Sequence, residues 1–159
     1  MQQATSNKQQ ATSNKQQATS NKQQAMKAEK IIPVLRIFDY KKTIEFYIDW
    51  LGFEIVWEHH FEENTPVYME VKKGNIILHL SEHHGDGTPE SRVFIWGEGV
   101  ADYHKELIDK KYKYNRPGLE KAFYGAVSFT VDDPFGNKII FNEEFDKEKH
   151  KDLEFCSIH

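Results

Sequence analysis

The sequence has a single cysteine, few prolines and no long hydrophobic run. Cys156 is the only cysteine among 159 residues, so no disulfide can form within the chain. A lone thiol is typical of a reducing compartment. No stretch approaches the roughly 18 apolar residues that a membrane-spanning helix needs, and the N-terminal residues lack the apolar core of a signal peptide. We therefore expect a cytoplasmic protein without a membrane partner.

Negative charge dominates most of the chain. The formal net charge is −4, yet the first 25 residues carry Lys8, Lys15 and Lys22 and no acid. Without these three positive charges the rest of the chain stands at −7. An acidic surface repels a phosphate backbone, which argues against nucleic acid as a partner. The same charge mildly favours a cationic ligand.

Residues 1–25 contain a repeat of the heptad QQATSNK, which occurs three times and is followed by QQA. A coiled coil needs two apolar positions in each heptad, and here the only apolar residue is alanine. Such a composition cannot bury enough surface to offset the entropy of the chain. We expect this segment to be disordered.

The folded part is expected to span residues 31–143 and to consist of two similar halves. Each half shows the order strand, helix, strand, strand, strand, at about 31–81 and about 92–143. The second strand of the second half, which follows the helix, is expected at 112–116. A Gly-Asn dipeptide precedes the last strand of each half, at 74–75 and 136–137. The pattern predicts an α+β fold of two tandem βαβββ modules. Residues 144–159 form a polar C-terminal tail with no assigned role.

Several segments resemble one family in order and spacing. They are Ile32-Pro-Val-Leu-Arg-Ile-Phe-Asp, Phe46-Tyr47, Leu51-Gly52-Phe53, Leu78-His79-Leu80-Ser81-Glu82-His83-His84-Gly85-Asp86-Gly87 and Asp133-Pro134-Phe135-Gly136-Asn137. They resemble the glyoxalase/bleomycin resistance, or vicinal oxygen chelate, superfamily and its bleomycin-resistance-like branch in particular. The resemblance implies mixed sheets that curve into a cup, a homodimer, and a ligand held in the cup or in the crevice between partners.

The resemblance also allows a test for metal. Metal-using members of the family place one ligand on each of four strands, and these positions fall here on Ile32, His79, Arg92 and Ile140. Only His79 could ligate, because isoleucine has no donor atom and arginine is a permanent cation. One imidazole cannot supply the three protein ligands of a catalytic metal site. We therefore expect no metal, no other cofactor and no catalytic residue.

Strand alternation predicts which side chains line the cup, because alternate residues face opposite sides of a sheet. The lining expected from this rule comprises Val34, Arg36, Glu58, His60, Tyr68, Glu70, Ile77, His79, Ser81, Arg92, Phe94, Trp96, Ser128, Thr130, Ile140 and Asn142. The ligand-binding candidates among them are His79, Trp96, Phe94, Tyr68, Glu58, Glu70 and Arg92. Trp50 and Trp57 are expected in the core or at a dimer interface.

Such a lining combines aromatic faces with carboxylates, which suits a planar ligand with cationic groups. The resemblance implies capture of an antibiotic such as bleomycin, and hence antibiotic resistance. Two alternatives stay open. One is an enzyme of the same superfamily, either a metal-using lyase or dioxygenase or a metal-free variant with His79 as base. The other is a module that serves only protein interactions.

Overall fold

The computed structural model describes residues 25–156, so the QQATSNK repeat and the last three residues lie outside the described part. The chain separates into two units, one up to Ile31 and one from Ile32 onward. All helices and strands of the described residues lie in the second unit.

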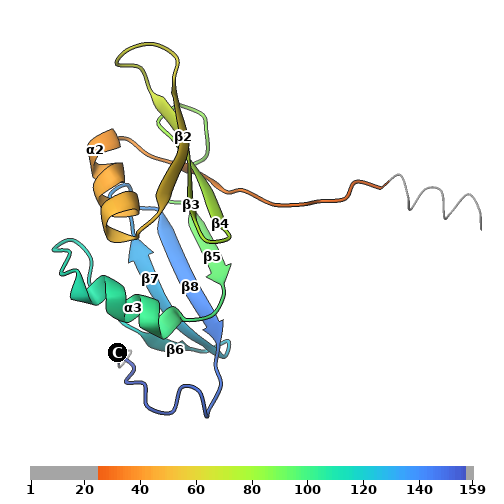
Figure 1. Ribbon diagram of the computed structural model, residues 1–159, viewed down its shortest axis with the longest axis vertical. Coiled ribbons are helices and arrows are strands. Elements are labelled where there is room, and N and C mark those ends of the chain that lie inside the picture. The colour runs from red at the N-terminus through yellow and green to blue at the C-terminus, as the bar shows by residue number, and fades with distance from the viewer. Residues whose placement is uncertain (1–24, 157–159) are drawn as a thin grey trace, which may run out of the picture. The chain divides into compact units, whose positions relative to one another are not determined.

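The first module forms a four-stranded mixed sheet with one helical segment. Its strand order is β1-β4-β3-β2, with β1 parallel to β4 and the other pairs antiparallel. The helical segment follows β1 and begins as an α-helix that continues as a π-helix (Figure 1). The elements are β1 (Val34–Arg36), α2 (Tyr40–Thr43), η1 (Ile44–Trp50), β2 (Glu54–His60), β3 (Val67–Lys73) and β4 (Ile76–Ser81).

The second module repeats this plan. Its strand order is β5-β8-β7-β6, again with one parallel pair between the first and last strands, and α3 packs across β7 and β8 (Figure 1). The elements are β5 (Arg92–Trp96), α3 (Val100–Asp109), β6 (Glu120–Ala122), β7 (Ala126–Asp132) and β8 (Lys138–Glu144). The predicted α+β fold of two βαβββ modules is thus confirmed. The strand expected at 112–116 is wrong, because the second strand of this module is the short β6 at Glu120–Ala122.

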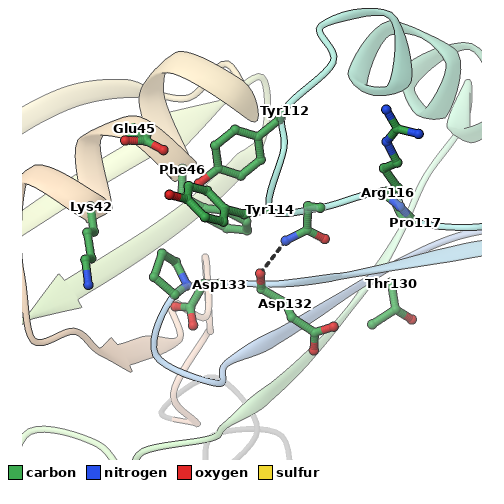
Figure 2. A pocket seen from close by; sticks show the side chains of 12 residues that line it. Lys42, Glu45, Phe46, Tyr112, Tyr114, Arg116, Pro117, Thr130, Asp132 and Asp133 are labelled. Atoms are coloured by element: carbon green, nitrogen blue, oxygen red, sulfur yellow. Dashed lines mark hydrogen bonds between the residues drawn. The ribbon is translucent and has the colours of Figure 1, made fainter.

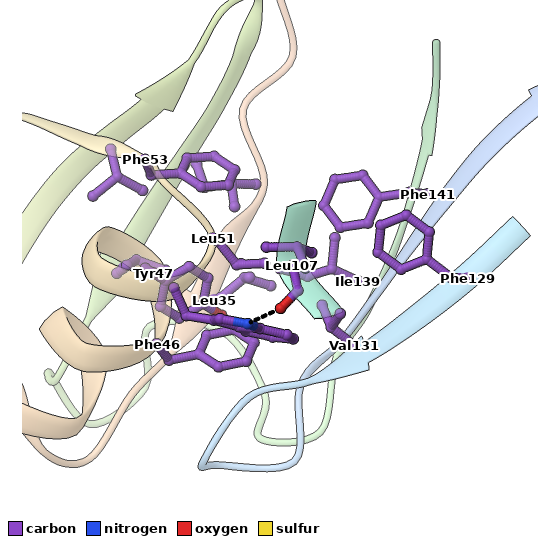
Figure 3. Packing of buried hydrophobic residues seen from close by; sticks show 14 of the residues in the cluster. Leu35, Phe46, Tyr47, Leu51, Phe53, Leu107, Phe129, Val131, Ile139 and Phe141 are labelled. Atoms are coloured by element: carbon purple, nitrogen blue, oxygen red, sulfur yellow. Dashed lines mark hydrogen bonds between the residues drawn. The ribbon is translucent and has the colours of Figure 1, made fainter. Parts of the chain in front are cut away.

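One hydrophobic core joins the two modules. The helix-facing side chains of both sheets pack together with the helices (Figure 3). Hydrogen bonds cross the boundary between the modules at buried positions: Trp50 Nε1 donates to the Leu107 carbonyl at 3.1 Å, and the Tyr47 hydroxyl donates to Asp133 Oδ2 at 2.8 Å. The helices therefore cover one face of each sheet. The opposite face of each sheet is left uncovered, and we call it the open face.

A β-bulge in β2 changes which side chains reach the open face of the first sheet. Ile55 pairs with Val71, but the next paired residue is Trp57, opposite Glu70, so Val56 is the extra residue. Directly paired residues point to the same side of a sheet, and one inserted residue reverses the alternation beyond it. Trp57 therefore lies on the open face with Glu70.

The same bulge corrects the lining expected for β2. Glu58 pairs with Met69 and His60 with Val67, and both partners are buried on the helix side. The Tyr40 hydroxyl, from the helix that covers this side, donates to Glu58 Oε2 at 2.8 Å. Glu58 and His60 therefore do not face the cup, whereas the faces expected for the other strands agree with the observed pairing.

The C-terminal tail is tied to the second module through Glu143, a buried residue of β8. Its carboxylate accepts hydrogen bonds from Lys149 Nζ at 2.6 Å, Gly99 N at 3.2 Å and His150 Nε2 at 3.2 Å. His150 is buried, and its Nδ1 accepts a hydrogen bond from Asp146 N. Burial alone would raise the pKa of Glu143, but the Lys149, Gly99 and His150 donors hold the pKa below its usual value.

Replacing Glu143 with glutamine should therefore destabilise the protein in a pH-dependent way. A carboxyl with a lowered pKa contributes stability above its unfolded pKa, and this contribution is lost as the pH falls through the folded value. We expect Glu143→Gln to lower the free energy of unfolding by about 1 to 3 kcal/mol at pH 7, and by much less well below pH ~4. Urea unfolding at both pH values measures this. The exposed neighbour Glu144 provides the control, and an equal loss at both pH values would contradict the assignment.

Candidate functional site

Three predicted site residues meet on the open face of the first sheet. His79 lies on β4, directly opposite Glu70 on β3, while Tyr68 lies two residues before Glu70 on the same face. The Tyr68 hydroxyl is 2.8 Å from His79 Nδ1, and His79 Nε2 is 2.7 Å from Glu70 Oε2. All three side chains are partly buried, so the hydrogen bonds hold the imidazole in one orientation.

The hydrogen atoms in this cluster can be assigned from its chemistry. When Glu70 is ionised and the His79 imidazole is neutral, the short contact requires the hydrogen on Nε2, and Nδ1 is left as an acceptor. The Tyr68 hydroxyl must then donate to Nδ1. Burial raises the pKa of Tyr68, and the nearby Asp86 and Glu70 carboxylates raise it further, so the phenol keeps its proton at neutral pH. In this state every polar hydrogen of Tyr68, Glu70 and His79 is used within the cluster, so these three side chains offer a ligand only oxygen lone pairs and one negative charge.

Trp57 completes this surface and was not among the predicted binding residues. Its ring is nearly parallel to that of Tyr68, with centroids 5.8 Å apart, and stands edge-on to His79 at 5.4 Å. The side chain is 41% exposed. The sequence carries no signal for this placement, because simple alternation along 54–60 puts Trp57 on the helix side and only the bulge brings it to the open face.

A second aromatic surface lies on the open face of the other sheet. Phe94 and Trp96 on β5 are 52% and 54% exposed, and both rings make edge contacts with Tyr124, at 6.2 and 5.9 Å between centroids. Arg92 is exposed on the same strand face. Tyr124 lies in the loop before β7 and was not predicted, because the alternation of side chains along a strand does not extend into loops.

The structure thus divides the seven predicted residues into two groups of three and one separate residue. His79, Tyr68 and Glu70 come together on the first sheet, and Phe94, Trp96 and Arg92 share a face of the second. Glu58 belongs to neither group. We name the cluster of Trp57, Tyr68, Glu70 and His79 the acceptor cluster.

The side chains at the four metal positions of the family do not fit a divalent ion. Ile140 offers only hydrocarbon in the second sheet, and Arg92 brings a permanent positive charge. His79 has both ring nitrogens engaged by Tyr68 and Glu70. Within residues 25–156, no three His, Cys, Asp or Glu side chains form a group that could hold a metal ion.

Comparison with known proteins places the fold in a family. The model of a family described as glyoxalase superfamily protein matches residues 16–148. This chain belongs to the glyoxalase/bleomycin resistance superfamily. Bleomycin resistance proteins of Geobacillus stearothermophilus and Staphylococcus aureus are 30% identical to it over 131 residues, which cover 71% of this chain and 95% of each relative.

Solved structures of the superfamily share the fold. A bleomycin-binding protein in complex with bleomycin matches with a TM-score of 0.57 and 18% identity, over 74% of this chain and all of that one. The bleomycin resistance determinant of transposon Tn5 matches with a TM-score of 0.59 and 19% identity, over 74% and 98%. None of the helices within residues 25–156 has the length and hydropathy of a membrane-spanning segment.

Proposed function

We propose that this protein is a metal-independent binding protein of the bleomycin resistance type. It captures a planar molecule with cationic, hydrogen-donating groups, and the acceptor cluster is the part of the site that recognises these groups. The observation that carries the proposal is the hydrogen-bond chain from Tyr68 through His79 to Glu70, beside the exposed ring of Trp57.

The chemistry of the cluster selects its ligand. Glu70 and the Tyr68 oxygen accept hydrogen bonds, so protonated amines, amidines and amide N–H groups suit them, and a carboxylate or phosphate is repelled. Trp57 offers a face on which a planar or cationic group can stack. A bleomycin-class drug combines planar arms with positive charge, and the superfamily relatives named above include bleomycin resistance proteins.

The proposal includes a homodimer. Each open face exposes large aromatic side chains: Trp57 on the first sheet, and Phe94 and Trp96 on the second. Exposed aromatic surfaces of this kind mark sites that a partner or a ligand covers. In a dimer, Phe94, Trp96 and Arg92 of one chain would then line the ligand site together with the acceptor cluster of the other.

Tryptophan fluorescence tests the binding. Titration of the full chain with metal-free bleomycin should change the emission in a saturable way at micromolar drug, and a chelator should not alter the titration. Trp50 is buried, so the signal is expected from Trp57 and Trp96. Trp57→Phe should remove a large part of the change, since this ring lies in the acceptor cluster. Unchanged emission up to high micromolar drug would exclude bleomycin as the ligand.

A further inference from the structure

A cavity lies apart from the acceptor cluster and is lined by none of its residues. Its volume is about 620 Å³, which is within the usual range for small-molecule sites. One wall is the α2–η1 helix, another is the loop 112–117, and the third is the end of β7 with the turn that follows (Figure 2). Both modules therefore contribute to this cavity, which we name the intermodule pocket.

Two of the acids that line the intermodule pocket are already engaged. Asp133 is buried and accepts four hydrogen bonds, from Tyr47, the Asn137 side chain and two backbone N–H groups. Asp132 forms an ion pair with Lys138. These two carboxylates have little capacity left for a ligand.

The two cations that line the pocket, by contrast, have no such partners. Neither the Lys42 ammonium nor the Arg116 guanidinium has an ion-pair or hydrogen-bond partner in the part of the chain that the structure describes. They stand at opposite ends of the pocket in Figure 2. Glu45 is the remaining acid, and it lies close to the phenol of Tyr112: burial and this carboxylate raise the pKa of Tyr112 to about 12. Of the charged groups that line the pocket, only Lys42 and Arg116 therefore have all of their hydrogen-bonding atoms free for a ligand.

Aromatic rings line the space between the two cations. The Tyr112 ring is stacked on Trp50, with centroids 5.0 Å apart and planes 28° from parallel, and it stands edge-on to Tyr114 at 5.5 Å. The Phe46 ring lies beside that of Tyr112, with centroids 6.5 Å apart. Because Trp50 is buried and hydrogen-bonded to the Leu107 carbonyl, it fixes the Tyr112 ring as a rigid wall.

We propose that the intermodule pocket is a second binding site, specific for a small aromatic anion such as an aryl carboxylate or aryl phosphate. The ring of the ligand packs on Tyr112 and Tyr114, and its acidic group pairs with Arg116, whose planar fork suits carboxylate and phosphate oxygens. Lys42 adds positive potential from the helix. This preference for an anion is the opposite of the preference for a cation proposed for the acceptor cluster, and the two proposals can be tested independently.

An NMR titration of the isotope-labelled full chain with 1-naphthyl phosphate tests the proposal. The backbone signals of Asn115 and Asp132 are expected to shift in a saturable way, and the neutral analogue 1-naphthol should bind at least tenfold more weakly. Arg116→Gln is expected to weaken binding by about five- to tenfold, as for a charge-assisted contact at a partly exposed position. Lys147→Gln is the control: it removes one exposed positive charge from the C-terminal tail, outside the intermodule pocket, and should leave the titration unchanged.

Three results would overturn the proposal: equal binding of 1-naphthol, equal effects of Arg116→Gln and Lys147→Gln, or binding of inorganic phosphate as tight as that of the aryl phosphate. The last would show that the rings contribute nothing. Arg116 is exposed, so the variant should keep its fold, and an unchanged circular dichroism spectrum checks this. Bleomycin binding should be the same in Arg116→Gln as in the original protein, which separates this test from that of the acceptor cluster.

Discussion

Replacing Asp133 with alanine is expected to lower the free energy of unfolding by about 3 to 5 kcal/mol. The carboxylate is buried where the turn after β7 meets the first module. Its Oδ2 accepts from the Tyr47 hydroxyl and the Asn137 amide, both at 2.8 Å, and its Oδ1 accepts from the backbone N–H groups of Phe135 and Asn137. The substitution leaves these donors without a partner in a buried place, and each such group costs about 1 to 3 kcal/mol.

The effect should extend beyond the turn, because Asn137 also donates to the Arg36 carbonyl of β1 at 2.8 Å. Asp133 therefore holds together a turn of the second module and two elements of the first. Asp132→Ala is the matched control, since that carboxylate is exposed and paired only with Lys138, and should cost less than about 1 kcal/mol. Urea unfolding of both variants gives the comparison. Similar losses for the two aspartates would show that the buried network does not join the modules.

Much of the fold could be predicted from the sequence, because most strands keep a strict alternation. Along β3, the buried Val67, Met69 and Val71 alternate with Tyr68 and Glu70, so the open face of this strand was assigned correctly before any pairing was known. Aspartate is a preferred capping residue at the start of a helix, and the Asp39 side chain accepts from Lys42 N at 2.8 Å where the first helix begins.

The acceptor cluster could be predicted only in part. His79, Tyr68 and Glu70 follow from alternation, but Trp57 and Glu58 exchange faces because Val56 is inserted in β2. A bulge depends on how a strand aligns with its neighbour, and residues 54–60 alone do not encode that register. The strand expected at 112–116 was wrong for a related reason: its aromatic residues suit a strand, yet Tyr112 packs on Trp50 of the other module.

Replacing Glu70 with glutamine should have the largest effect on ligand binding. The substitution removes the negative charge of the acceptor cluster, and the new amide can donate to His79 Nε2. The imidazole would then carry its hydrogen on Nδ1 and donate to Tyr68, which frees the phenol to act as a donor. The three polar side chains, which offered only acceptors, would then present a donor, so a cationic ligand loses both its charge partner and an acceptor. We expect binding to weaken by about 10- to 100-fold.

The structure provides a closely matched control for this variant. Glu58 is another glutamate, on the neighbouring strand, and it was predicted from the sequence to bind the ligand together with Glu70. The bulge places it on the helix side, where it accepts from the Tyr40 hydroxyl. Its conversion to glutamine makes the same change in net charge without touching the acceptor cluster, and should alter binding by less than about twofold.

The account is tested most directly by calorimetric titration of metal-free bleomycin into the original protein, Glu70→Gln and Glu58→Gln under the same conditions. A loss of affinity of about tenfold or more in Glu70→Gln alone is the predicted result. Equal affinities in all three proteins, or a greater loss in Glu58→Gln, would show that the ligand is not held by the chain of hydrogen bonds from Tyr68 to Glu70.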